Sequence, residues 1–258
     1  SEAMFSGVVA IGANFWSELY PDDKPEGLKP FPAMRHEDRH MPAVPMDLFI
    51  QLRSDRQDVN YIASRRILSL FGETIELIEQ VPCFRYLDGR DLTGFVDGTE
   101  NPKGRKRREV ALLPPGSKFS GGSFVHIQRY RHHLNRWDSM PTEEQELIIG
   151  RTKIEDIEFS GQDMPETAHV KRANVKDDEG KAMELMRQSM PYGNLTTQGL
   201  MFISYCARPD NFETILANMV FGSDEGSYDH LLNYTTAETG AAFFAPSIDY
   251  LLNQGNVE

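Results

Sequence analysis

The run of nine residues from Gly94 to Pro102, Gly-Phe-Val-Asp-Gly-Thr-Glu-Asn-Pro, constrains the fold of this chain more than any other segment. Gly94 and Gly98 can adopt backbone angles that are closed to other residues, and Pro102 keeps Asn101 extended. The run therefore predicts a rigid loop, and not a helix, that holds the Asp97 carboxylate with little side-chain bulk around it. An ordinary Asp-Gly turn would explain the same residues.

The composition is that of a globular chain without a membrane-spanning segment. Of the 258 residues, 40% are apolar. No run approaches the about 20 apolar residues that span a bilayer, and the first residues do not form a signal peptide. The net charge of -12 argues against nucleic acid and anionic membranes as partners. Cys83 and Cys206 are too few for a disulfide framework, so we expect a cytoplasmic protein.

Hydrophobic periodicity predicts a first α+β unit with the order β-β-α-β. Strands are expected over residues 5–12, 47–53 and 75–88, and a helix capped by Asp58 is expected to end at Gly72. This order becomes the ferredoxin-like βαββαβ arrangement if a strand and a helix precede it. We therefore expect the first unit to lack its initial strand and helix.

A second unit repeats strands and helices in a similar order. Its predicted strands cover residues 121–130 and 200–206, with a last apolar segment at Phe243-Phe244. Its predicted helices follow a Thr142-x-x-Gln145 capping box, Asn211 and Ser227.

The fold class that follows is α+β, with two ferredoxin-like domains built on antiparallel sheets. We expect an incomplete N-terminal domain over residues 1–95 and a linker with the Asp97 loop over 96–120. The C-terminal domain is expected over 121–258.

The chemistry-bearing residues point to a haem site without proving one. No motif of a zinc site, a serine hydrolase or a phosphate-binding loop occurs. What remains is Asp97, the loop histidine His169, and Arg187 with Ser189 just before a Pro/Gly turn. In a haem peroxidase an imidazole holds the iron, a base moves a proton between the peroxide oxygens, and a cation stabilises the developing charge. Each residue alone is more often a surface charge or a loop residue, and spacing does not decide.

Several segments, taken together and in order, resemble the dye-decolourising peroxidases, in particular the bacterial B-type enzymes. The resemblance covers nearly the whole chain. The segments are Gly94–Pro102, Gly121–Ser123, Ile149–Lys153, Glu166–His169, Arg187–Gly193 and Phe243–Ser247.

The resemblance implies a haem b peroxidase that reduces hydrogen peroxide and oxidises bulky donors, such as dyes or phenols, by one-electron steps through a ferryl intermediate. It implies catalytic roles for Asp97, Arg187 and Ser189 on the peroxide side of the haem. His169 is the implied axial ligand of the haem iron. An Asp-based site also predicts an acidic pH optimum, because aspartate stays ionised at low pH.

Further haem contacts follow from the same resemblance. Arg151 matches an arginine that meets a haem propionate, although it could equally compensate the carboxyl end of the preceding helix. Asp229 is the candidate acceptor of the axial imidazole N–H. Thr99 and Glu100 are expected at the haem edge.

Roles for aromatic and other apolar residues are less determined. Leu200, Phe202 and Phe244 are candidate pocket walls, and core packing explains them equally well. Candidate relays for oxidising bulky donors at the surface are Trp16, Trp137, Tyr130 and Tyr234.

Other functions of the same fold stay open at this point. The chain could process haem or porphyrinogens, releasing iron from an intact tetrapyrrole, or it could carry haem without catalysis. The expected partners of a peroxidase are hydrogen peroxide and small-molecule reductants. Members of the family commonly self-associate, so a homo-oligomer, dimer or higher, is also expected.

Overall fold

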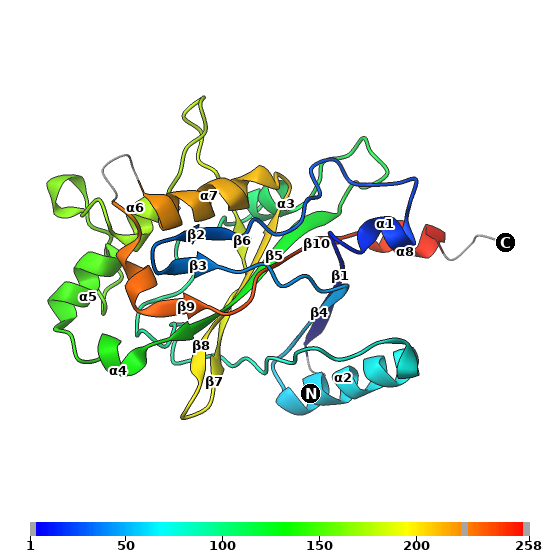
Figure 1. The fold of residues 1–258 in the computed structure, drawn as a ribbon, viewed down its shortest axis with the longest axis horizontal. Coiled ribbons are helices and arrows are strands. Elements are labelled where there is room, and N and C mark those ends of the chain that lie inside the picture. The colour runs from blue at the N-terminus through cyan, green and yellow to red at the C-terminus, as the bar shows by residue number, and fades with distance from the viewer. Residues whose placement is uncertain (1–3, 223–226, 255–258) are drawn as a thin grey trace.

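One antiparallel sheet organises the computed structural model, which describes residues 4–222 and 227–254 (Figure 1). The strand order is β4-β1-β10-β5-β8-β6, with β7 also paired to β8 and β9 also paired to β5. The strands of this sheet are β1 (Phe5–Gly12), β4 (Leu48–Ser54), β5 (Ser123–His132), β6 (Met186–Arg187), β7 (Met190–Gly193), β8 (Gln198–Cys206), β9 (Thr235–Ala237) and β10 (Ala241–Ala245).

Helices surround the sheet, and a separate hairpin is formed by β2 (Met34–His36) and β3 (Arg39–Met41). The α-helices are α1 (Trp16–Leu19), α2 (Gln57–Phe71), α3 (Lys106–Ala111), α4 (Leu134–Trp137), α5 (Thr142–Ile149), α6 (His169–Ala173), α7 (Asp210–Phe221) and α8 (Ile248–Gln254). Three short 3-10 helices complete the description: η1 (Gly72–Thr74), η2 (Gly161–Asp163) and η3 (His230–Asn233).

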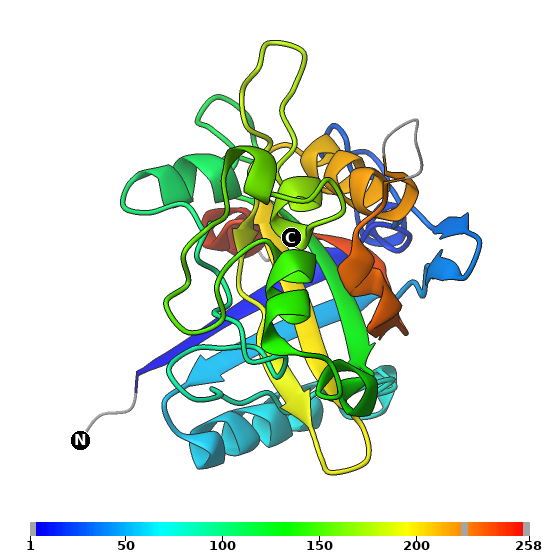
Figure 2. The same cartoon turned by 90° about the vertical axis from the view of Figure 1, so that its left-hand side faces the viewer.

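The central strands β5 and β8 are largely buried on both faces; β8 is a nearly continuous apolar run from Leu200 to Cys206, whereas β5 mixes apolar residues with polar ones. On one face, α7 packs its apolar side, including Phe212 and Leu216, over Phe124 and Cys206. The opposite face is covered by α3 and by the segment around Val81. Figure 2, which turns the α4 and α5 end of the molecule toward the viewer, shows helices and loops crowding that end of the sheet.

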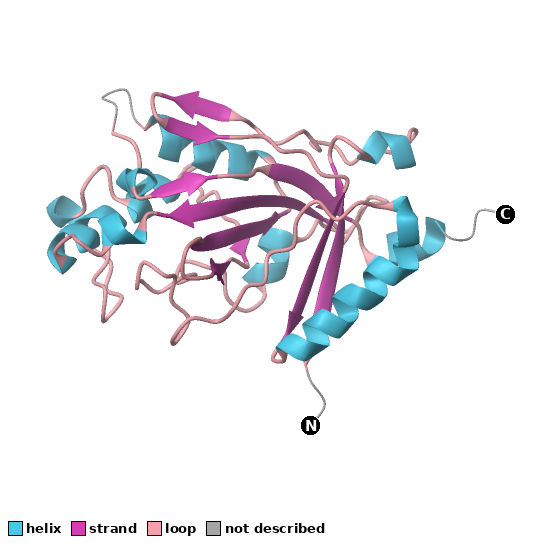
Figure 3. Cartoon of the chain, turned by 60° about the horizontal axis from the view of Figure 1, so that its bottom comes forward, coloured by secondary structure: helices cyan, strands magenta, loops and turns pink. Residues whose placement is uncertain are grey.

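Helix α2 lies alongside β1 and β4 rather than over the central strands (Figure 3). It matches the predicted helix, but Asp58 does not cap it: the N-cap residue is Arg56, whose side chain pairs with Asp58. None of its residues is buried, and apolar Ile62 and Leu70 are exposed. Its packing therefore contributes less to stability than that of α7.

The structure confirms the α+β class and the antiparallel sheet. The strands expected over residues 5–12, 47–53, 121–130 and 200–206 form within two residues of their predicted bounds. The strand expected over 75–88 is wrong. Isolated bridges form there instead, between Cys83 and Tyr192 and between Tyr86 and Arg90, and side-chain pairs such as Glu79–Arg129 also hold the segment.

Helix ends were predicted less well than helix interiors. The Thr142 capping box does not form, because Pro141 occupies the N-cap and the buried amide of Gln145 donates to the carbonyl of Trp137 instead. Gly150 ends α5 in the left-handed region, as predicted.

The two later caps are also wrong. Asn211 lies inside α7, where its side chain donates to the carbonyl of Glu184, and Pro209 is the N-cap. The helix expected from Ser227 begins at His230 instead, with Asp229 as its cap. In each case a tertiary hydrogen bond or a nearby better acceptor outweighs the local capping signal.

Candidate active site

A buried carboxylate orients the imidazole of His169, the first residue of α6. Nδ1 of His169 lies 2.7 Å from Oδ2 of Asp229, which has no exposed surface. The second oxygen of Asp229 accepts a hydrogen bond from the Leu231 N–H and so begins η3. Burial by itself lowers the pKa of His169, but the Asp229 carboxylate more than offsets this and raises it. Because Asp229 occupies Nδ1, Nε2 is left to bind another group.

The loop that carries Asp97 uses both of its glycines in the left-handed region of backbone angles. Gly98 has a φ of +79°, and the amide of Asn101 would lie 3.0 Å from a Cβ atom at that position. Gly94 has a φ of +90°, and Lys153 fills the space of its absent side chain. The backbone N–H of Asp97 donates to the carbonyl of Gly89. Larger residues at either glycine would strain the backbone and displace the loop.

Asp97, Arg187 and His169 share one electrostatic environment. Burial raises the pKa of Asp97, the charge of Arg187 opposes that rise, and the Asp91 carboxylate adds to it. His169 lowers the pKa of Asp97 as well. The structure therefore brings together the acid, the arginine and the histidine that the sequence singled out.

Arg187 and Ser189 come from an interrupted edge of the sheet. Arg187, in β6, pairs with Ser204, and its Nε is buried without a hydrogen-bond partner among the described residues. Between β6 and β7, the hydroxyl of Ser189 accepts a 3.3 Å hydrogen bond from the Ile203 N–H. Since that hydroxyl is the acceptor in this bond, its proton is free to donate elsewhere.

Asn101 is a site residue that the sequence reasoning missed. Its Oδ1 accepts a hydrogen bond from the Arg187 N–H at 2.8 Å, and its Nδ2 donates to the Arg187 carbonyl at 3.0 Å. The side-chain amide thus acts as a strand partner for Arg187. The only signal in the sequence was its place before Pro102, which indicates an extended backbone and says nothing about a partner.

Arg151 gathers acidic side chains near the Asp97 loop. Its guanidinium donates to Asp156 at 2.7 Å, to Glu158 at 2.8 Å and to Glu100 at 3.0 Å. Thr99 donates to the other oxygen of Asp156 at 2.6 Å. These contacts bring Arg151, Thr99 and Glu100 together, and they are not contacts with the end of α5.

The predicted pocket walls differ in their surroundings. Phe244 has no exposed surface and packs in an aromatic group with Trp16, Phe119 and Phe124. Phe202 is half-buried and packs against Phe212 of α7. Core packing accounts for Phe244, and a haem contact for either residue stays a prediction.

Among the predicted relays, Trp16 and Trp137 have no exposed surface and Tyr130 is also buried. Tyr234 is half-buried, and its ring centroid lies 5.4 Å from that of Trp137. A relay role for any of these residues also stays a prediction.

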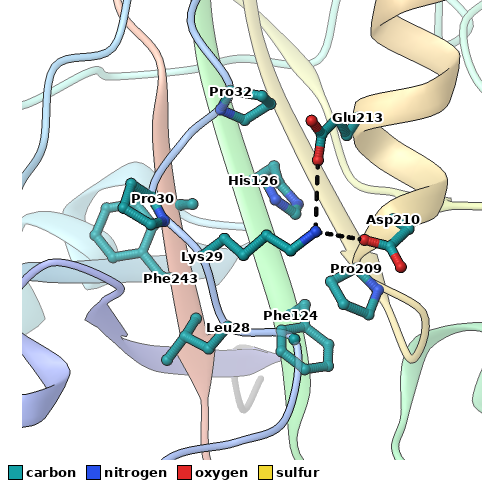
Figure 4. Close-up of a pocket in the computed structure, with 12 residues that line it drawn as sticks. Leu28, Lys29, Pro30, Pro32, Phe124, His126, Pro209, Asp210, Glu213 and Phe243 are labelled. Carbon is teal, nitrogen blue, oxygen red and sulfur yellow. Dashed lines mark hydrogen bonds and ion pairs between the residues drawn. The ribbon is translucent and has the colours of Figure 1, made fainter.

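A separate cavity lies between the segment 27–32, β5 and α7 (Figure 4). Lys29 bridges Asp210 and Glu213 at its mouth, and His126 lines it. Its volume of about 10 Å³ holds about one water molecule. It is not lined by Asp97, Arg187 or His169 and is too small for an organic ligand.

Two family models together match most of the chain. The model for the N-terminal domain of Dyp-type peroxidases matches residues 2–85, and that for the C-terminal domain matches residues 88–250. The chain belongs to the Dyp-type peroxidase family. The predicted family and peroxidase activity are thereby confirmed, and the enzyme class with them.

Individual Dyp-type peroxidases are similar over nearly the whole chain. A dye-decolorizing peroxidase of Mycobacterium tuberculosis is 37% identical, with 95% of this chain and 74% of the relative covered. A putative Dyp-type peroxidase structure from Shewanella oneidensis has a TM-score of 0.96 at 53% identity, covering 97% of this chain and 82% of the other. A variant of Rhodococcus jostii DypB in complex with haem has a TM-score of 0.93 at 38% identity, covering 96% and 81%.

These structural matches confirm the predicted pair of ferredoxin-like α+β units. The boundaries at residues 95 and 120 stay a prediction. Among the residues that the structure describes, every helix is too short or too polar to cross a membrane.

Proposed function

We propose that this Dyp-type peroxidase binds haem b, reduces hydrogen peroxide, and oxidises bulky organic donors such as dyes or phenols by one electron at a time. The observation that carries the proposal is the His169–Asp229 hydrogen bond, with the charges of Asp97 and Arg187 acting on the same imidazole. The haem-bound relative from Rhodococcus jostii supports the same cofactor here.

The residues present fit haem. Nε2 of His169 is the ring nitrogen that Asp229 leaves open, and it would ligate the iron. The buried Nε of Arg187, which has no partner within residues 4–222 and 227–254, is a donor that a bound group would satisfy. Arg151 would meet a propionate, whose carboxylate would take the place of an exposed acidic partner such as Glu100. When bound, haem supplies the redox centre.

The protein side chains divide the work on peroxide. The Asp97 carboxylate accepts a proton from one peroxide oxygen and returns it to the oxygen that leaves as water. Arg187 stabilises the negative charge that builds on the leaving oxygen as the O–O bond breaks. Ser189, through its free hydroxyl proton, donates to the bound peroxide. Each of two donor molecules then supplies one electron.

Rapid mixing of the haem-loaded protein with hydrogen peroxide tests these roles. We expect Arg187→Leu to slow the first spectral change by roughly 100-fold or more, the usual cost of losing one charge-stabilising donor. An arginine variant as fast as the parent would remove Arg187 from the mechanism. A His169→Ala variant with full haem content and the parent's ferric spectrum would refute the axial assignment.

The same preparations separate the alternative functions. Release of iron from an intact tetrapyrrole without peroxide would favour haem processing. A haem protein that neither reacts with peroxide nor releases iron would be a carrier.

The partners we propose are hydrogen peroxide and small-molecule reductants, in a cytoplasmic homo-oligomer. Self-association is supported by the position of β4 at the edge of the sheet and by the exposed apolar residues Ile62 and Leu70 of α2. Light scattering on the purified protein measures the number of subunits.

A further inference from the structure

His132, the last residue of β5, is buried and hydrogen-bonded through both ring nitrogens. Its Nε2 lies 3.1 Å from Oδ1 of Asp91, and its Nδ1 lies 2.9 Å from the hydroxyl oxygen of Thr235. Only 6% of the His132 side chain and 13% of the Asp91 side chain are exposed. A buried, paired imidazole and carboxylate are costly to desolvate, which makes this pair unusual outside a functional site.

The first of these contacts leads to the Asp97 loop. Oδ2 of Asp91 accepts hydrogen bonds from the backbone N–H of Thr93 at 3.0 Å and from its hydroxyl at 2.7 Å. The backbone of Asp91 adds two more, from its N–H to the Phe95 carbonyl and from the Gly94 N–H to its own carbonyl, each at 2.9 Å. Asp91 therefore closes the turn that leads directly to Asp97, and His132 anchors this turn to the sheet.

The second contact leads to the opposite side of the site. Thr235 begins β9, pairs in register with His132, and directly follows η3 and Tyr234. The cap of η3 is Asp229, whose carboxylate orients His169. The short segment 229–235 thus connects the hydroxyl that His132 binds to the carboxylate that His169 binds.

Trp137 spans the same two segments beside His132. Its indole N–H donates to the carbonyl of Thr93 at 2.9 Å. Its ring lies edge-on to Phe95 of the Asp97 loop and to Tyr234 of the other segment, with centroids 6.0 Å and 5.4 Å apart. Fully buried packing of this kind resists compression and stretching, so the two segments are held at a fixed spacing.

We propose that His132 is a positioning residue that fixes the Asp97 loop relative to the Asp229–His169 pair, through Asp91 on one side and Thr235 on the other. The inference rests on the proposed function, because the spacing matters to a haem held by His169 and faced by Asp97. His132 touches neither reacting atoms nor cofactor; it acts through its two partners.

Haem-loaded variants with two spectroscopic readouts test this positioning role of His132. The affinity of the ferric protein for fluoride reports the peroxide side, where Arg187 and Asp97 lie. The iron–histidine stretching frequency of the ferrous protein, measured by resonance Raman, reports the His169–Asp229 side. His132→Leu removes both side-chain contacts of the imidazole. Asp91→Asn weakens only the contact with residue 91, and Thr235→Val removes only the contact with the hydroxyl of residue 235. In His132→Gln, the amide can donate to Asp91 and accept from Thr235. The matched control is His133→Leu, the neighbouring half-buried histidine, whose ring contacts Thr236 instead of Asp91 or Thr235.

We expect His132→Leu to lower fluoride affinity by about 10-fold, the lower end of what losing an outer partner costs a metal site, and also to lower the iron–histidine frequency. Asp91→Asn should change only the first readout and Thr235→Val only the second. His132→Gln should stay close to the parent, and His133→Leu should match it. A purely structural role would lower thermal stability without this separation.

A His132→Leu protein that keeps both parent signals, or loses only one, would refute the positioning role of His132. If that variant does not fold, Asp91→Asn and Thr235→Val decide the question. The proposal is also refuted if each of these variants changes both readouts or neither. A parent protein that binds haem but shows no iron–histidine band would refute the proposed function instead. This outcome is distinguishable because it appears in the parent protein, before any variant is compared.

Discussion

The side-chain amide of Asn101 makes two hydrogen bonds to the backbone of Arg187, one to its N–H and one to its carbonyl. A peptide group in a neighbouring strand would make the same pair of bonds. Since Asn101 belongs to the run from Gly94 to Pro102, the arginine and the Asp97 loop are joined directly. A shift of either therefore shifts the other.

Replacing Asn101 by leucine should slow the reaction with peroxide by roughly 100-fold, because displacing a catalytic group by about 1 Å has that effect. Haem content should not change, since His169 is untouched. Stopped-flow mixing with peroxide measures the rate. Asn194→Ala, which removes an exposed turn asparagine, is the control and should react like the parent. An Asn101→Leu enzyme with the parent's rate would mean that Arg187 is positioned by the sheet alone.

The pH profile of the peroxide reaction should be governed by Asp97. Burial raises the pKa of its carboxyl, and only the carboxylate accepts a proton, so kcat/KM for peroxide should fall as pH drops through a value above the about 4 of free aspartate. The sequence alone predicted a more acidic profile.

Replacing Arg187 should shift the acid limb of this pH profile in a known direction. Its charge lowers the pKa of Asp97, so Arg187→Leu should move the acid limb of kcat/KM to higher pH. Asp97→Asn should remove the limb from the profile. If the limb persists in the asparagine variant, another group controls it.

Asp229→Asn should raise the ferric/ferrous midpoint potential by on the order of 60 mV, equivalent to a tenfold change in relative affinity for the two iron states. The carboxylate makes the His169 ring a stronger donor and so favours ferric iron. Asparagine can still accept from the Leu231 N–H and cap η3, so the fold should be kept. Spectroelectrochemical titration measures the potential, and an unchanged value would show that the carboxylate does not tune the iron.

His126 should make the protein sensitive to mild acid. Its ring is stacked on Phe212 at 4.1 Å, and its Nδ1 is buried without a partner among the described residues. Burial lowers the pKa of His126 to about 3, so between there and the ordinary value of 6.5 the unfolded chain binds one more proton than the folded chain. The free energy of unfolding should therefore decrease as the pH is lowered, by up to about 1.4 kcal/mol per pH unit.

A His126→Phe variant isolates this contribution, because phenylalanine keeps the stack on Phe212 and cannot bind a proton. Urea unfolding at pH 7 and pH 5 should show a smaller loss of stability in the variant than in the parent. The control is His40→Phe, which replaces an exposed histidine. Equal losses in all three proteins would place the acid sensitivity elsewhere.

The sequence predicted those elements whose own residues carry the signal. The helical period of α7 and the alternating pattern of β5 are local signals, and both elements formed where they were expected. The segment 75–88 has strand-like composition too, but pairing depends on a partner strand, and Cys83 and Tyr86 form isolated bridges only. Capping failed for a similar reason, since Gln145 and Asn211 bond to residues elsewhere in the fold.

The site shows the same limit. Asp97, Arg187 and His169 could be named because their motifs resemble those of a known family, whereas composition and spacing left them ambiguous. Asn101 and His132 could not be named, because their roles depend on partners distant in sequence. Arg187 is 86 residues from Asn101, and Thr235 is 103 residues from His132. No local pattern encodes such contacts.

The pairing of β1 with β10 has a consequence for how the chain reaches its fold. Ile11 lies opposite Phe244, and β10 fills the place between β1 and β5. During synthesis β1 leaves the ribosome long before β10, so the strand edges of β1 and β5 that pair with β10 stay unpaired while most of the chain is still being made. Closure of the sheet is therefore a late, long-range event, and a nascent chain stalled before β10 should be a preferred client of chaperones.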